Sequence, residues 1–181
     1  TDGVGCILTA TVVITEPLAL NTAITASTNP TCFGVCNGDA TSSTSGGTGA
    51  YTYSWDDPGT QTTITATGLC VGVIQIMVTD ANGCQDSATV TLTQPPTLAL
   101  STIDTNVSCN LGSDGSIDLT VTGGTPTYTY AWSNSATSQD LSNIGAGSYT
   151  VTVTDANGCI DSTTVVITEP IALTVVITTV N

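Results

Sequence analysis

The sequence predicts an all-β protein made of tandem immunoglobulin-like β-sandwich repeats of about 77 residues, stapled by disulfides. Thr, Val and Ile are abundant, and branching at Cβ makes these residues suit a pleated, half-buried surface. Strong helix formers are scarce, and Lys and Arg are absent. Short alternating runs are separated by Gly, Asn, Asp and Pro, which is typical of strands and turns.

Internal repetition sets the organisation of the chain. Residues 79–84 (TDANGC) recur at 154–159, and residues 51–55 (YTYSW) recur at 128–132 as YTYAW. The second pair is offset by 77 residues and the first by 75, so one loop is shorter by two residues in the second copy. Self-similarity at a fixed period indicates a repeat architecture.

These copies divide the chain into four segments. Residues 18–95 and 96–170 are expected to form two complete immunoglobulin-like repeats. Residues 1–17 are expected to be the last strand of an upstream repeat, and residues 171–181 the first strand of a downstream one.

Each complete repeat contains about seven strand-like runs, including one short irregular segment. In the second repeat the regular runs are 97–104, 115–122, 127–132, 138–142, 148–154 and 160–168. Residues 150–154 alternate with a period of two, as a strand with one solvated face should. Asp-Ala-Asn-Gly between two runs predicts a hairpin turn, because Asn and Gly tolerate a positive φ.

Trp55 and Trp132 each lie inside a strand-like run flanked by alternating Tyr. This position predicts that both indoles fill the core between the two sheets. The alternative is an exposed aromatic patch that stacks on carbohydrate.

Seven cysteines without any His indicate disulfides in an oxidising compartment rather than a zinc site. Cys32 and Cys84 of the first repeat have counterparts in Cys109 and Cys159 of the second. We therefore expect one bridge of the same kind in each repeat, Cys32–Cys84 and Cys109–Cys159.

The remaining cysteines are not shared by the two repeats. Cys36 and Cys70 are replaced in the second repeat by Ser113 and Gly145, and this joint absence predicts that the two cysteines pair with each other. Cys6 is left over: either its partner lies in an upstream repeat, or it bonds a neighbouring subunit.

The charge balance excludes several functions. The chain has 14 acidic groups and no Lys, Arg or His, so it lacks the cations that neutralise phosphates in nucleic acids or attract anionic membranes. Catalytic triads that need His or Lys cannot form, and no run of about 20 apolar residues predicts membrane insertion. Asp56 and Asp57 resemble a glycosidase carboxylate pair. Their counterparts are Ser133 and Asn134, so we interpret them as a turn and predict no enzyme.

No cofactor is expected, and calcium is the one alternative. Asp80 and Asp155 open the two Asp-Ala-Asn-Gly turns and could bind a hard cation together with Asp114 or Asp118. An Asx-turn alone also explains an Asp at this position.

Essentially all of the chain resembles the SprB-type repeat, and residues 97–170 match best. The resemblance rests on Cys109, on GGTP at 123–126, on YTYAW, on GSYTVTVTDANGC at 147–159 and on ITEP at 167–170. SprB-type repeats occur in giant cell-surface adhesins of gliding Bacteroidota and in other secreted proteins of that phylum. The resemblance implies extracellular, cell-surface localisation in a bacterium, a role in adhesion, gliding motility or filament structure, and no catalysis.

The resemblance also implies O-glycosylation, because proteins of this phylum carry O-glycans on Asp-Ser/Thr-small motifs. Ser87 and Ser162 lie in such motifs at equivalent positions. Ordinary strand-edge polarity is the other explanation of these residues.

The function that we expect is structural: a segment of an extracellular filament or adhesin stalk, whose partners are neighbouring repeats or copies of itself. One alternative is a module that binds surface polysaccharide. Another is a filament subunit assembled by strand exchange through the terminal strands.

Overall fold

The computed structural model describes residues 3–5 and 9–177. The described residues form twelve strands and no helix, so the all-β prediction is confirmed. The chain divides into two compact units. Unit 1 comprises Thr1–Ser27, Asp39–Thr67 and Val73–Thr91; unit 2 comprises Thr28–Gly38, Gly68–Gly72 and Leu92–Asn181.

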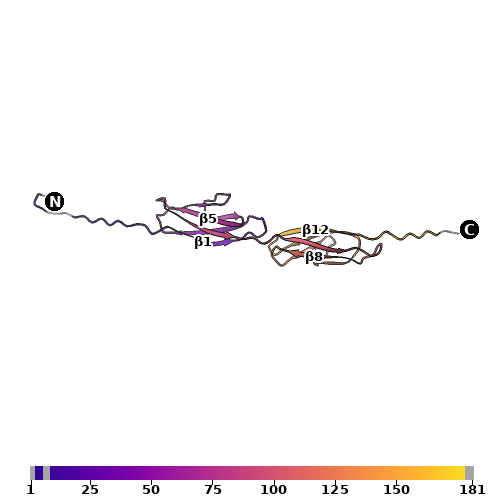
Figure 1. Cartoon of the computed structure of the whole chain (residues 1–181). Helices are drawn as coiled ribbons and strands as arrows, with labels where there is room; N and C mark the ends of the chain where they lie inside the picture. Colours follow the sequence, from indigo (N-terminus) through magenta and orange to yellow (C-terminus); the bar gives the residue numbers. More distant parts are fainter. Residues whose placement is uncertain (1–2, 6–8, 178–181) are drawn as a thin grey trace. The chain divides into compact units, whose positions relative to one another are not determined.

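The strands of the first repeat form two three-stranded sheets, in the orders β1-β2-β4 and β3-β5-β6. Their bounds are β1 Asn21–Thr28, β2 Gly38–Ser45, β3 Thr52–Trp55, β4 Thr65–Leu69, β5 Gly72–Thr79 and β6 Gln85–Leu92. β3 pairs antiparallel with β5, with Trp55 opposite Ile76. Figure 1 labels β1 and β5, one strand from each sheet.

The second repeat has the same arrangement, with sheets in the orders β10-β8-β7 and β12-β11-β9. Its strands are β7 Ala99–Thr105, β8 Gly115–Thr122, β9 Thr129–Trp132, β10 Leu141–Ile144, β11 Gly147–Thr154 and β12 Ile160–Ile167. β8 and β12, labelled in Figure 1, again belong to different sheets. Both repeats are therefore immunoglobulin-like sandwiches of short antiparallel strands.

Alternation along the strands builds the core between the sheets. In β11, Val151 and Val153 are fully buried, whereas the Thr residues between and beside them are not. Val151 lies opposite Trp132 of β9, so large apolar side chains gather on one face. The core of the second sandwich consists of ten buried residues: Val107, Ile117, Leu119, Trp132, Leu141, Ile144, Val151, Val153, Val165 and Ile167.

Two expectations differ from the structure. The described part of each sandwich has six strands rather than about seven, since the irregular run forms no strand. The described parts of the expected terminal strands, residues 9–16 and 171–177, are not in strands either. A strand needs a neighbour to pair its N–H and C=O groups, and apolar residues such as Ile14 and Leu173 stay exposed there.

Candidate functional site

A buried carboxylate organises the turn between β11 and β12. Asp155 is only 5% exposed, and it accepts hydrogen bonds from the backbone N–H groups of Thr125 (2.7 Å), Asn157 (2.9 Å) and Cys159 (2.8 Å). Burial by itself opposes ionisation, but these donors outweigh it and hold the pKa of Asp155 below its ordinary value. The turn is thus fixed by an ionised acceptor, and it holds Cys159 in place.

The equivalent turn of the first repeat has the same design. Asp80 accepts from the N–H groups of Thr48 (2.8 Å), Asn82 (2.9 Å) and Cys84 (2.8 Å). The hydrogen bond from Thr48 is the largest influence on its pKa, which lies below the ordinary value despite desolvation. Both Asp-Ala-Asn-Gly turns therefore present a cysteine from a preorganised loop.

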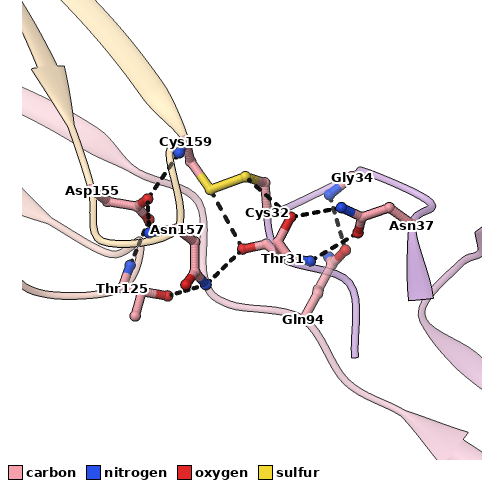
Figure 2. Close-up of a disulfide and its surroundings, with 9 residues drawn as sticks. All are labelled: Thr31, Cys32, Gly34, Asn37, Gln94, Thr125, Asp155, Asn157 and Cys159. Atoms are coloured by element: carbon pink, nitrogen blue, oxygen red, sulfur yellow. Dashed lines mark hydrogen bonds between the residues drawn. A yellow bond between two sulfur atoms is a disulfide. The ribbon is translucent and has the colours of Figure 1, made fainter. Parts of the chain in front are cut away.

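The turn after β11 is joined by a disulfide to a loop of the first repeat. Cys159 bonds Cys32, across 127 residues of sequence and with 5.8 Å between the two Cα atoms. Both cysteines belong to unit 2. Figure 2 shows that polar contacts surround the bond: the Asn157 amide donates to the Thr31 carbonyl (3.0 Å) and to the Thr125 hydroxyl (3.0 Å).

The residues between the two repeats are fastened to the same loop. The Gln94 side-chain oxygen accepts from the N–H of Gly34 (2.9 Å; Figure 2). The side-chain oxygen of Asn29 accepts from the N–H of Thr93 (2.9 Å). Pro95 and Pro96 follow directly, and each has a fixed φ and no N–H. The hydrogen bonds of this inter-repeat segment and the Cys32–Cys159 bond therefore both lie within unit 2.

The predicted pairs Cys32–Cys84 and Cys109–Cys159 are wrong, and the strand order of the second sandwich explains why. Ile144 of β10 pairs with Gly115 at the start of β8, so the chain enters β11 at the end of the sandwich that carries the Cys109 loop. β11 then runs eight residues to the turn before Cys159, which is roughly 26 Å at the rise of a strand.

A disulfide requires Cα atoms within about 7 Å. The loop cysteine and the hairpin cysteine of one sandwich therefore lie at opposite ends and cannot bond. Among the described residues, Cys84 and Cys109 are free and exposed. Cys6, expected to be unpaired or intermolecular, lies outside the described residues.

The third predicted bridge is present. Cys36 bonds Cys70, with a sequence separation of 34. Cys36 precedes β2 and Cys70 lies between β4 and β5, and strands β2 and β4 are neighbours in one sheet. Comparison of the two copies therefore identified this pair correctly, because both cysteines are present in the first repeat and both are replaced in the second.

The two tryptophans are buried, as the sequence predicted: Trp55 is 2% exposed and Trp132 is 4% exposed. Each indole N–H donates to a backbone carbonyl, that of Thr63 (2.8 Å) or that of Ser138 (2.9 Å). These rings pack in the cores and offer no exposed platform on which a sugar could stack.

The acidic candidates serve in turns. Asp57 accepts from the N–H groups of Gly59 (2.9 Å) and Gln61 (3.0 Å), and Asp56 accepts from the N–H of Gln75 (2.7 Å). Desolvation opposes ionisation of Asp57, but its hydrogen bonds, led by that from the Gln61 side chain, keep its pKa below the ordinary value.

For calcium, the described residues contain no group of three or more His, Cys, Asp or Glu arranged to hold a metal ion. Asp114 accepts from the hydroxyl (2.5 Å) and the N–H (3.0 Å) of Ser108, and the Ser108 hydroxyl leads in lowering its pKa. Asp118 lies in β8, where it pairs with Ile103 of β7. Because both oxygens of Asp155 accept backbone donors, the structure supplies no cluster of free carboxylate ligands at that turn.

Ser87 of β6 and Ser162 of β12 are exposed, and each strand lies at the edge of its sheet. The side chain of Asp86 accepts from the N–H of Thr22 (2.6 Å). The serines are accessible, and their glycosylation stays a prediction.

Sequence reasoning missed the polar residues that surround the Cys32–Cys159 bond, chiefly Thr31, Gln94 and Asn157. The signal for Asn157 was present, because the Asn of the repeated TDANGC run occupies the same place in both copies. Its second acceptor belongs to another repeat, so the local pattern could not reveal it.

Comparison with known proteins gives one family and several structures. Three solved structures resemble the chain at low similarity: an amphioxus IgVJ-C2 molecule (16% identity, TM-score 0.33, covering 68% of this chain and 91% of that one), the N-terminal eight Ig domains of Down Syndrome Cell Adhesion Molecule (13%, 0.35, 86% and 25%) and murine CEACAM1b (16%, 0.32, 84% and 100%). No curated protein sequence matches the chain.

The SprB repeat family matches residues 24–60 and residues 101–137. The two matches are equal in length and 77 residues apart, and each begins in the first strand of a sandwich and extends past its buried tryptophan. The chain therefore carries two matches to the SprB repeat in tandem, one in each sandwich.

Proposed function

We propose that this segment is a load-bearing spacer of an extracellular filament or cell-surface adhesin stalk, and that it has no catalytic role. The observation that carries the proposal is the Cys32–Cys159 bond. It closes a loop that contains β2 to β11, so tension applied at the two ends of the chain bypasses these strands. Of the strands, β1 and β12 alone lie in the path of the force.

Other features support this role. The absence of Lys and Arg denies trypsin-like proteases any site, and 14 unopposed carboxylates keep the surface solvated. SprB repeat proteins are cell-surface or extracellular proteins, and the likeness to Bacteroidota adhesins supports a place on such a surface. No helix able to cross a membrane is found in the described part of the chain.

Single-molecule pulling from handles at both ends tests the proposal. The Cys32–Cys159 bond keeps 127 residues from being stretched. In a Cys32→Ser, Cys159→Ser variant the Cys36–Cys70 bond still keeps 34 of them from being stretched, so 93 residues are newly free to extend. The variant should therefore extend further than the wild type by roughly 330 Å, at ~3.6 Å per residue. Cys84→Ser is the matched control and should extend like the wild type. Equal extension of wild type and double variant would contradict the proposal.

Strand exchange is a second candidate, favoured by the apolar exposure of residues 171–177. Leu173 and Val175 are 99% and 87% exposed, as expected of a strand that lacks its sheet. Val175→Pro removes a ladder donor and should abolish assembly between copies, measured by sedimentation, whereas Thr174→Ser should leave it unchanged. Unchanged assembly of the proline variant would eliminate this candidate.

A further inference from the structure

Cys84 and Cys109 are free, exposed and equivalent to two cysteines that are bonded to each other. Cys109 occupies the position of Cys32 in its repeat, and Cys84 occupies the position of Cys159. The chain thus contains one formed bridge and the two unmatched halves of another bridge of the same kind. Cys84 belongs to the first sandwich and Cys109 to the second, and neither can bond the other cysteine position of its own sandwich, because the loop and the hairpin turn lie at opposite ends.

The free loop cysteine keeps the local geometry of the bonded one. The N–H of Ser108 donates to Asp114 at 3.0 Å, as the N–H of Thr31 donates to Asn37 at 3.0 Å. The hydroxyl beside each sulfur lies at a matching distance, 3.8 Å for Cys109 and 3.9 Å for Cys32. The loop therefore holds Cys109 in the same local geometry as Cys32, although Cys109 has no disulfide partner.

The loop is also fastened to the end of its own repeat in the same way. Glu169 accepts from the N–H of Leu111 (2.6 Å), as Gln94 accepts from the N–H of Gly34 (2.9 Å). A cavity of about 520 Å³ lies against Cys109 and is lined by Ser108, Pro170 and Leu173 among others. A hairpin turn that brings a cysteine to Cys109 would have room to enter here.

The turn that carries Cys84 has the same hydrogen bonds to its Asp carboxylate as the turn that carries the bonded Cys159. Cys84 receives the same support from Asp80 as Cys159 does from Asp155, with the N–H to carboxylate distance at 2.8 Å in both. The Asn157 amide donates to two acceptors, the second being the Thr31 carbonyl across the bridge. The Asn82 amide donates to the Thr48 hydroxyl (2.8 Å), its one acceptor among the described residues.

We propose that Cys109 of one copy of this chain forms a disulfide with Cys84 of a second copy, in head-to-tail order, with the Asn82 amide donating to the Ser108 carbonyl of the other copy. The sulfurs and the hydrogen-bonding groups of the Cys32–Cys159 junction have counterparts: a Thr or Ser carbonyl, two sulfurs, an Asn amide and a Thr hydroxyl. Repetition of the bond makes a covalent series of repeats.

The oxidant in this reaction is a small-molecule disulfide such as oxidised glutathione, which accepts the two electrons. The Cys109 thiolate attacks one of its sulfurs and releases one glutathione thiolate. The Cys84 thiolate of the second copy then displaces the other glutathione, so one protein disulfide forms and two glutathione thiols are produced. The step needs no metal.

Three variants of the full chain, all carrying Cys6→Ser, test the proposal. The first keeps both thiols, the second adds Cys84→Ser and the third adds Cys109→Ser. They are oxidised with oxidised glutathione at about 150 mM salt, which limits repulsion between the acidic copies. Products are separated on non-reducing gels, and peptic peptides made at low pH are mapped by mass spectrometry, with Cys32–Cys159 as the internal check.

The first variant should form a ladder of covalent oligomers, and each single-thiol variant alone should lose it. Mixing the two single-thiol variants should give a covalent heterodimer linked through Cys109 and Cys84, in excess over both homodimers. Asn82→Ala, which leaves Cys84 in place, should slow this coupling but not the reaction of Cys84 with a simple thiol reagent. Homodimers in the statistical proportion, or a Cys84–Cys109 bond within a monomer, would overturn the proposal. The pulling experiment depends on Cys32–Cys159 alone, so the two proposals fail separately.

Discussion

At the scale of single residues, the carboxylates of Asp80 and Asp155 are the fixed points of the molecule. Each replaces three backbone-to-water hydrogen bonds by three internal ones, and each does so next to a cysteine. A hydrogen bond to a charged acceptor is worth more than one between neutral groups. The turn is therefore rigid enough to hold a sulfur in a position to bond.

These carboxylates make stability depend on acid. The folded-state pKa of Asp155 lies below its unfolded value of about 3.9, so its stabilisation is complete above that pH and is lost as the pH falls through the folded pKa. Asp155→Asn should lower the melting temperature at pH near 7. As the pH falls below about 4, the melting temperature of this variant should decrease less than that of the wild type. Thermal melts followed by circular dichroism measure both effects.

Asp104→Asn is the matched control for this experiment. Asp104 is exposed on β7 and makes no side-chain hydrogen bond among the described residues, so its replacement removes a carboxylate without removing an internal hydrogen bond and should keep the wild-type melting temperature at neutral pH. If Asp155→Asn kept the wild-type melting temperature at neutral pH, the turn would not owe its order to this carboxylate.

At the scale of elements, the two sandwiches differ in one disulfide: the first contains Cys36–Cys70 and the second has no equivalent bond. Cys36–Cys70 closes a loop of 34 residues around β2, β3 and β4, and the second repeat has Ser113 and Gly145 at these positions. The second repeat reaches the same strand order without the bond. The bridge thus adds stability to a fold that the strand pattern already specifies.

Removal of this bridge should therefore weaken the first repeat without changing its fold. In the chain-entropy relation, a loop of this length contributes about 4 kcal/mol, which the Cys36→Ser, Cys70→Ser variant should lose. Urea unfolding followed by Trp fluorescence measures the loss, with Cys84→Ser as a control because that thiol is free. An unchanged midpoint would show that the bridge does not constrain the unfolded chain.

At the scale of the whole molecule, charge of a single sign is the dominant property. A net charge of -14 without any cation means that surface charges repel one another. Screening should relieve this repulsion, so the melting temperature should rise as salt shortens the Debye length from about 30 Å to about 8 Å.

The salt series has a simple control. An uncharged osmolyte at matched osmolarity changes hydration but does not screen charge. The melting temperature should therefore rise when salt is added to a low-salt buffer, but not by the same amount when the osmolyte is added. A melting temperature that stayed constant or fell over this range would contradict the view that like-charge repulsion limits the stability of the chain.

The sequence by itself determined the class of fold, the repeats, the buried tryptophans and the Cys36–Cys70 pair. Period-two alternation, turn residues and the comparison of two copies are local signals, and they act through short-range backbone geometry and burial. The Asp-Ala-Asn-Gly turns could be predicted for the same reason.

Only the tertiary structure decided the partner of Cys32. A loop cysteine and a hairpin cysteine recur once in each repeat, so the sequence is equally compatible with pairing inside a repeat and with pairing between successive repeats. The length of β11 settles the choice, since an eight-residue strand separates the two cysteines of one sandwich by far more than a disulfide can span. The physical reason is that a disulfide depends on which ends of the strands meet in space, and this follows from strand order rather than from spacing along the chain.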